Sequence, residues 1–135
     1  MSVFDHIAFK VSNIGRSRSF YESCMPKLGL SLIARSSSGF FINGGKRAPV
    51  PFMFVSQSAH GNASADMKPG NHLHLMFAAT SREAVQDFFE AAMKAGGTDS
   101  SRPGYQGAEE MGYYAALVHD PDGNTLEAGF RERKR

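Results

Sequence analysis

The sequence has little cysteine, no long apolar run and almost no net charge. Its single cysteine, Cys24, excludes a disulfide within the chain, and the first residues show neither the basic nor the apolar part of a signal peptide. We therefore expect a cytoplasmic protein. No stretch approaches the roughly 18 apolar residues of a transmembrane helix, so we expect a soluble protein and no membrane partner.

The charge distribution argues against a nucleic-acid partner. Lys and Arg number 15 against 13 Asp and Glu, a net charge of +2, but four of the positive charges lie in the last five residues, 131–135, beside one negative charge. The remainder of the chain is close to neutral. A nucleic-acid-binding protein usually spreads Lys and Arg over one face of its fold, and we expect a short basic tail like this one to be solvated.

A chain of 135 residues has the size of one small domain. Residues 3–11 have the alternation of a half-buried strand, and the apolar stripe that follows Asn13 predicts a helix that ends near Gly29. Three short β-like stretches come next, at residues 30–35, 39–43 and 51–56. The second half begins with an alternating strand at residues 73–77 and a helix capped by Thr80 and Glu83. Further β-like runs, 113–118 and 124–128, flank a turn of sequence Asp-Pro-Asp-Gly.

The two halves of the chain repeat. A single offset of 68 residues pairs His6 with His74, Phe9 with Phe77, Phe20 with Phe88, Glu22 with Glu90 and Gly29 with Gly97. Neither copy could bury a sheet face alone, so the two copies should pack together. We expect an α+β fold of two tandem modules: module one at about 1–57, a linker at about 58–70, module two at about 71–130 and a basic tail at 131–135.

Three residues of the repeat could hold a metal ion. His6 and His74 point away from the apolar faces of their strands, and Glu127 points away from the apolar face of the last strand. Two imidazoles and a carboxylate suit a divalent transition metal with open positions for substrate. The alternative is that each histidine is a hydrogen-bonded structural residue. His72 is a rival ligand on the face of His74, whereas His60, His119 and Asp120 are expected to be solvated in loops.

The sequence resembles the vicinal oxygen chelate superfamily, which includes glyoxalases, bleomycin-resistance-type proteins and extradiol dioxygenases. The resemblance covers nearly the whole chain and rests on these segments in order: Asp-His-Ile-Ala-Phe at 5–9, Phe-Tyr at 20–21, Leu-Gly-Leu at 28–30, His-Leu-Met-Phe-Ala at 74–78, Gly-Gly at 96–97, Asp-Pro-Asp-Gly-Asn at 120–124 and Leu-Glu at 126–127. It implies paired βαβββ modules that form an open, cupped β-barrel with helices outside. It also implies metal ligands at His6, His74 and Glu127, and the second half looks most like bacterial glyoxalase-like members.

One departure from the family pattern concerns the fourth ligand. Glyoxalase I proteins take a carboxylate from the final strand of module one, but residues 51–56 contain no acid, and Gln57 is the nearest polar substitute. This puts the glutathione-dependent isomerase in doubt and leaves a three-ligand site. The metal would be Zn, Ni, Fe or Mn.

Other residues are candidates for contact with substrate. Glu127 and Tyr114 are catalytic candidates, and four further side chains could bind substrate: Lys10, Arg102, Tyr105 and Tyr113. Because neighbouring residues on a strand face opposite ways, at most one of Tyr113 and Tyr114 can enter a pocket.

The leading hypothesis is a metal-dependent, glyoxalase-like lyase or isomerase that acts on a small molecule with vicinal oxygens. One alternative is an extradiol-type ring-cleaving dioxygenase. Another is a metal-free small-molecule-binding protein like the bleomycin-resistance members. The resemblance also favours a homodimer.

Overall fold

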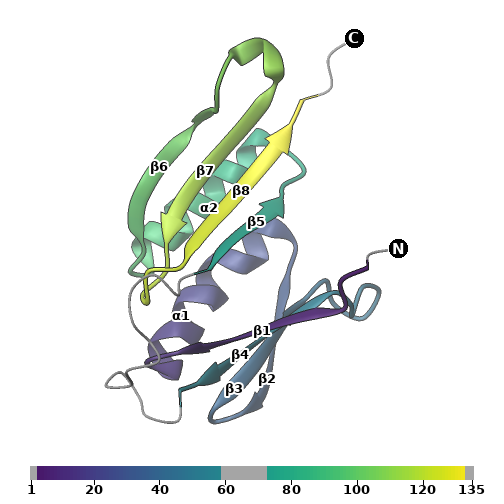
Figure 1. The fold of residues 1–135 in the computed structure, drawn as a ribbon, viewed down its shortest axis with the longest axis vertical. Coiled ribbons are helices and arrows are strands. Elements are labelled where there is room, and N and C mark those ends of the chain that lie inside the picture. Colours follow the sequence, from purple (N-terminus) through teal and green to yellow (C-terminus); the bar gives the residue numbers. More distant parts are fainter. Residues whose placement is uncertain (1–2, 59–72, 133–135) are drawn as a thin grey trace.

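The computed structural model describes residues 3–58 and 73–132. Most of the expected linker, the rival ligand His72 and the loop residue His60 lie outside the described residues. Module one contains β1 (His6–Val11), α1 (Ile14–Cys24), the short 3₁₀ helix η1 (Met25–Leu28), β2 (Ser31–Ser36), β3 (Gly39–Asn43) and β4 (Phe52–Gln57). Module two contains β5 (His74–Ala78), α2 (Arg82–Lys94), β6 (Thr98–Tyr105), the 3₁₀ helix η4 (Glu109–Met111), β7 (Tyr113–His119) and β8 (Thr125–Arg131), as Figure 1 shows.

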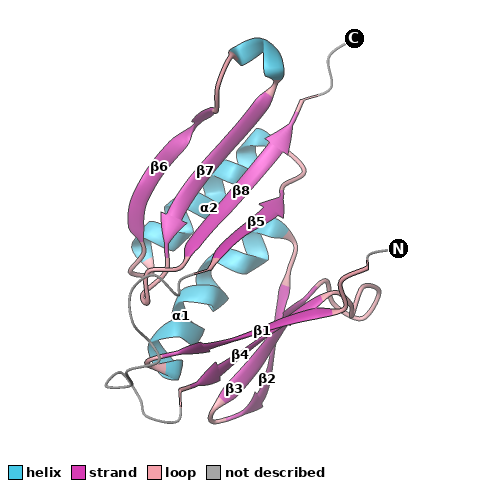
Figure 2. Cartoon of the chain, in the orientation of Figure 1, coloured by secondary structure: helices cyan, strands magenta, loops and turns pink. Residues whose placement is uncertain are grey.

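Each module forms one four-stranded mixed sheet, and the two sheets have equivalent strand orders. The first sheet has the order β1-β4-β3-β2 and the second β5-β8-β7-β6. In each, the strand before the helix lies parallel to the last strand of its module. This confirms the α+β fold and the two βαβββ modules. The sheets form two separate units, so the barrel-like arrangement is open (Figure 2).

The apolar faces of the two sheets and both helices share one core. α1 and α2 pack against each other, and α2 covers one face of the second sheet (Figure 2). Phe9, Leu75 and Phe77 pack against this core, as the alternation predicted. The largest fully buried side chains come from both modules: Phe20, Tyr21, Met25, Phe40, Ile42, Phe88 and Leu126. Each helix packs against the sheet of its own module, and the two modules join mainly where α2 packs against α1 and η1.

Local sequence signals fix most helix ends. The Asn13 side chain accepts a hydrogen bond of 3.0 Å from the backbone N–H of Arg16, and Gly29 adopts a left-handed φ of 79° after η1. At α2 the cap differs from the prediction: Ser81, not Thr80, accepts from the backbone N–H of Ala84 at 3.0 Å. The prediction placed the cap one residue too early because both residues are hydroxyl caps of similar preference.

Two elements differ from the predicted boundaries. Strand β6 was not predicted, because its sequence, Thr-Asp-Ser-Ser-Arg-Pro-Gly-Tyr, is polar and contains proline and glycine. It lies at the edge of the second sheet and pairs only with β7, and proline is tolerated on such an edge. Arg131, expected in the solvated tail, is the last residue of β8.

The Asp-Pro-Asp-Gly turn joins the two modules. Asp120, expected to be solvated, is only 3% exposed and accepts a 2.6 Å hydrogen bond from the hydroxyl of Tyr21 on α1. Asp122 accepts from the backbone N–H of Ser12 at 3.1 Å. Asp120 also accepts from the N–H groups of Asp122 and Asn124, so the predicted turn role holds as well. Burial occurs because α1 packs over the turn.

Among residues 3–58 and 73–132, no helix has the length and apolar character needed to cross a lipid bilayer.

Candidate functional site

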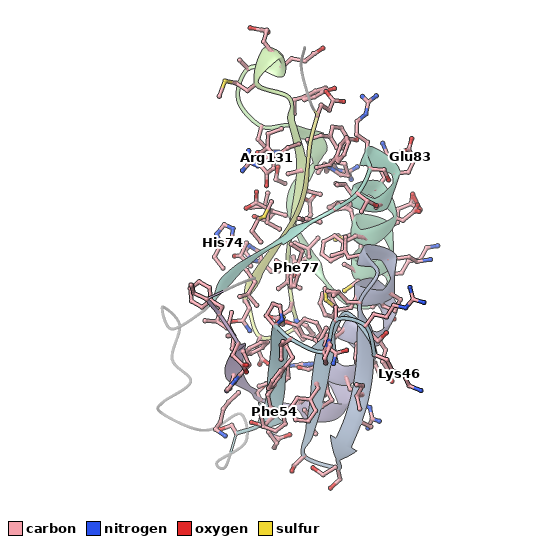
Figure 3. The ribbon with its side chains drawn as sticks, turned by 90° about the vertical axis from the view of Figure 1, so that its right-hand side faces the viewer. Lys46, Phe54, His74, Phe77, Glu83 and Arg131 are labelled. Carbon is pink, nitrogen blue, oxygen red and sulfur yellow. The ribbon has the colours of Figure 1, made fainter. Side chains whose placement is uncertain are left out.

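His74 and Glu127 form a close pair on the outer face of the second sheet, the face turned away from α2. β5 and β8 are parallel neighbours, with His74 opposite Thr125 and Met76 opposite Glu127. The Glu127 side chain extends back toward the start of β5, and its Oε1 lies 2.8 Å from Nε2 of His74. Figure 3 shows His74 on the side of the molecule opposite Glu83 of α2, so the imidazole faces away from the core.

The second oxygen of Glu127 is held by Tyr113. The Tyr113 hydroxyl donates a 2.5 Å hydrogen bond to Glu127 Oε2 from the neighbouring strand β7. This approach requires Gly129, because a Cβ on that residue would lie 2.5 Å from two ring carbons of Tyr113. Glycine within a strand is a usual sign that another group approaches the backbone closely. Gly129 therefore leaves the space in which the ring crosses β8 to reach the carboxylate.

Arg131 covers the ring of Tyr113. Its guanidinium carbon lies 4.3 Å from the ring centroid, a cation–π contact. Burial of the phenol, followed by its hydrogen bond to Glu127, raises the pKa of Tyr113 to about 12. The phenol therefore keeps its proton near neutral pH and acts as a donor to Glu127.

His6 occupies the equivalent place in module one but has different neighbours. Its Nδ1 lies 2.8 Å from Oδ1 of Asp5, and its ring stacks on Phe52 with centroids 4.7 Å apart and an interplanar angle of 8°. Within the described residues, no three His, Cys, Asp or Glu side chains are grouped closely enough to hold a metal ion. The single chain thus brings His74 to Glu127 and leaves His6 apart from them.

A cavity of about 300 Å³ lies beside His6, between module one and β5. The side chains that line it are Phe4, His6, Ile7, Leu30, Ile42, Asn43, Pro51, Phe52, Met53, Leu75, Met76 and Phe77. None of them is Asp, Glu, Lys or Arg.

Tyr114 lies on the opposite face of β7 from Tyr113. It is 9% exposed, and its hydroxyl accepts a 2.9 Å hydrogen bond from the side-chain amide of Gln86 on α2. The phenol beside Glu127 is therefore that of Tyr113, and the phenol of Tyr114, the one predicted for catalysis, lies on the helix side of the sheet. The alternation rule had limited the choice to one of the two, but the face depends on the register of β7 against β8.

Tyr105 packs edge-on against Tyr114 and belongs to a polar group at the start of α2. Its hydroxyl donates to the carboxylate of Glu132 at 2.9 Å and accepts from Arg82 at 3.2 Å. The hydrogen bond to Glu132 raises the pKa of Tyr105. These contacts fasten the end of β8 to α2, and they lie on the helix side of the sheet rather than beside Glu127.

Three polar candidates have contacts unrelated to the His74 and Glu127 pair. Arg102 is 81% exposed on the edge strand β6 and pairs with Asp99. Lys10 lies on the face of His6 and donates to the Ser56 hydroxyl at 3.2 Å. Gln57 accepts from the backbone N–H of Ile14 at 2.8 Å and donates to the carbonyl of Ser12 at 2.7 Å. Gln57 thus holds the start of α1 through both polar atoms of its side-chain amide.

Sequence reasoning did not identify Gly129 and Arg131 as part of the site. Both lie on β8 on the same face as Glu127, two and four residues further along, where the period of a strand places them. The predicted strand ended at residue 128, one residue before Gly129, so the sequence offered no signal within that strand.

Comparisons with known proteins agree with this architecture. The family model described as Glyoxalase/Bleomycin resistance protein/Dioxygenase superfamily matches residues 3–128. A glyoxalase/bleomycin resistance protein from Albidiferax ferrireducens T118 is 29% identical, with a TM-score of 0.75 over 97% of this chain and 100% of that one. No curated protein matches the sequence.

Two more distant structures share the fold. A glyoxalase/bleomycin resistance protein/dioxygenase family enzyme from Burkholderia phytofirmans PsJN is 20% identical, with a TM-score of 0.69 over 95% of this chain and 98% of that one. A glyoxalase-related enzyme from Fulvimarina pelagi is 18% identical, with a TM-score of 0.71 over 96% of this chain and 88% of that one.

Proposed function

The chain belongs to the glyoxalase/bleomycin resistance protein/dioxygenase superfamily, and from this membership and the His74–Glu127 pair we propose that it is a metal-dependent, glyoxalase-like lyase or isomerase. Its substrate would be a small molecule with two neighbouring oxygen atoms. The observation that carries the proposal is the 2.8 Å approach of an imidazole nitrogen to a carboxylate oxygen on an open sheet face.

The donor atoms of this pair fit a divalent transition metal. Imidazole nitrogen and carboxylate oxygen are ligands of Zn, Ni, Fe and Mn. Ligating carboxylates in proteins are themselves usually held by an outer hydrogen bond, and Tyr113 supplies one to the oxygen of Glu127 that does not face His74. A bound metal would supply Lewis acidity to two neighbouring substrate oxygens.

His6 is the proposed third ligand. Metal-binding histidines commonly donate their other ring N–H to a carboxylate, and the contact of His6 Nδ1 with Asp5 is of that kind. Such a contact leaves Nε2 for the metal. The side chain of His6 is 51% exposed, so its ring is accessible from outside the chain.

We propose that the site is completed in a homodimer. Within the described residues His6 is not grouped with His74 and Glu127, so His6 of one protomer would join His74 and Glu127 of a second. β1 and β5 are both edge strands, with one side open to another chain.

The proposed location is the cytoplasm. The only cysteine of the chain, Cys24, is a buried free thiol, which supports this location.

This chain's own residues have defined tasks in the proposed reaction. His74 and Glu127 would hold the ion, and the Tyr113 hydroxyl keeps its proton and fixes Oε2 of Glu127. Glu127 would serve as a ligand in this arrangement, and Tyr113 rather than Tyr114 is the phenol available beside it.

Elemental analysis of untagged protein purified without added metal tests the proposal. We expect about one transition metal per site, lost in His6→Ala, His74→Ala and Glu127→Ala. His119→Ala is the matched control, because His119 lies on neighbouring β7 and contacts Thr125 instead of Glu127. Normal metal content in His74→Ala would contradict the assignment. Zn or Ni would favour lyase or isomerase action, whereas Fe or Mn with oxygen consumption would favour the dioxygenase.

Mixing two inactive variants tests the two-chain site. A mixed dimer of His6→Ala and Glu127→Ala protomers contains one site with all three ligands, since each protomer supplies what the other lacks. We expect metal binding to reappear on mixing. If the three ligands come from one chain, mixing restores nothing, and the dimeric site is wrong.

The metal-free binding protein is the second candidate, and one observation favours it. Phe41 and Phe52 meet edge-on on the outer face of the first sheet, with ring centroids 5.2 Å apart, and both are partly exposed. Aromatic surface that stays accessible to solvent is a feature of binding faces. Absence of metal after reconstitution with Fe(II), Mn(II), Ni(II) and Zn(II) would establish this candidate over the enzyme.

A further inference from the structure

The cavity beside His6 has the properties of a small-molecule pocket. Its volume of about 300 Å³ is at the lower end of the range for ligand sites. Strands β1, β3 and β4 contribute to one side of it and β5 to the other, so it lies where the two modules meet. Ten of its twelve lining side chains are apolar.

Both polar side chains of the lining already have hydrogen-bond partners within the chain. Asn43 already has partners, because its Oδ1 accepts from the N–H of Gly45 at 2.8 Å. The other polar residue is His6, whose Nδ1 contacts Asp5. Because no Asp, Glu, Lys or Arg lines the cavity, burial of an ion there would be unfavourable, so the complementary occupant is uncharged.

The lining of the cavity also contains aromatic rings. The rings of Phe52 and His6 are stacked and nearly parallel, with an interplanar angle of 8°, and Phe41 meets Phe52 edge-on at 85°. The flexible thioethers of Met53 and Met76 complete the lining, and sulfur makes favourable contacts with ring edges. Apolar cavities of about 150 Å³ bind benzene, so this larger space accommodates a two-ring system.

We propose that this cavity binds an uncharged aromatic ring of the substrate, next to His6. The enzyme would then act on a compound in which an aromatic group is joined to the pair of neighbouring oxygens. This inference rests on the proposed function for the role of His6, while the ring-binding step itself requires no metal.

Ring binding can be measured on the full chain after treatment with a chelator. The probe is 2-naphthol, followed by its fluorescence, with its saturated analogue decahydro-2-naphthol as a competitor of similar size. Phe52→Leu removes the phenyl ring from the lining, and Leu30→Phe fills part of the cavity. Phe54→Leu is the matched control, since Phe54 is on the same strand and face as Phe52 but does not line the cavity.

We expect saturable binding of 2-naphthol and weaker binding of the saturated analogue. Phe52→Leu should weaken naphthol binding by about 3- to 10-fold, the range of aromatic pair contributions. Leu30→Phe should weaken it through lost volume, and Phe54→Leu should leave it unchanged. Thermal unfolding of each variant shows whether it remains folded, and Phe52→Leu decides the matter if Leu30→Phe does not fold.

Three results would overturn the inference: no saturable binding, equal binding of the saturated analogue, or an equal loss in Phe54→Leu and Phe52→Leu. Sedimentation in which naphthol dissociates a dimer would also overturn it, by assigning the cavity to a second copy of the chain.

Metal content, measured separately, distinguishes the two proposals. Naphthol binding without any metal would support the ring site and reject the enzyme, whereas metal binding without naphthol binding would do the reverse.

Discussion

The outer faces of the two sheets have the same backbone plan and opposite chemistry. Around His74 the second sheet presents Glu127, Tyr113 and Arg131, which are polar and linked to one another. Around His6 the first sheet presents aromatic rings. The two modules thus share a fold and each has one histidine at the equivalent position. The neighbours of His74 are mainly polar side chains, whereas those of His6 include several aromatic rings.

Strand register shows which residue changes between the modules. Met76 of β5 lies opposite Glu127, and Ala8 of β1, its equivalent in the repeat, lies opposite Phe54. The position of Glu127 in module two is therefore taken by Phe54 in module one. This difference accounts for the missing carboxylate of the family pattern. An aromatic side chain, Phe54, lies where the second module has a carboxylate.

The largest expected effect concerns the support of Glu127. Gly129→Ala should displace the Tyr113 ring, because the new Cβ would meet it at 2.5 Å, and Tyr113→Phe removes the same hydrogen bond directly. Loss of such an outer hydrogen bond costs about 10- to 100-fold in metal affinity. Competition with a chelating dye measures it. Both variants remove the same hydrogen bond, so the double variant should bind metal no more weakly than either single variant. Additive losses of affinity would show that the two changes act through different contacts.

The junction between the modules gives the next effect. Tyr21→Phe leaves buried Asp120 without one donor, so the free energy of unfolding should fall by about 1–3 kcal/mol. Urea denaturation gives the value. Tyr105→Phe, at a hydroxyl that is accessible to water, is the control and should cost less. Equal losses in the two variants would show that the turn does not depend on Tyr21.

The difference between the two outer faces can be reversed at one position. Phe54→Glu places a carboxylate near His6, and if the proposed metal site is correct, affinity should rise by at least about tenfold, the smallest contribution of an outer partner. Phe54→Gln is the neutral control of the same size. The same chelator competition applies to both. A gain in the Gln variant equal to that in the Glu variant would exclude a new charged ligand as the cause.

A smaller effect follows from Cys24, buried on α1 of module one. Burial raises its pKa from 9.0 to about 12, so the native state keeps the proton after the unfolded chain has lost it. Stability should consequently fall as the pH rises from about 9 toward 12. Between pH 8 and pH 10 the wild type should lose about 1.4 kcal/mol more than Cys24→Ala. Urea unfolding at the two pH values tests this, and parallel losses in both proteins would refute it.

The sequence predicted the elements better than it predicted their contacts. The alternation at His6 and His74 assigned both strand faces, and Asn13 marked the start of α1. Strand β6 escaped prediction because an edge strand needs little apolar pattern. The sequence did not show that Gln57 holds the start of α1. Its backbone partners there are 43 and 45 residues away in the chain, so no local pattern links them.

The sequence by itself determined the two βαβββ modules, the faces of their strands and the family, because these depend on local periodicity and ordered motifs. Only the tertiary structure decided that Glu127 meets His74 across 53 residues, that Tyr113 rather than Tyr114 supports it, and that His6 lies among aromatic rings. These features depend on strand register and on how the two helices pack, and a shift of one residue in register would turn every side chain to the other face.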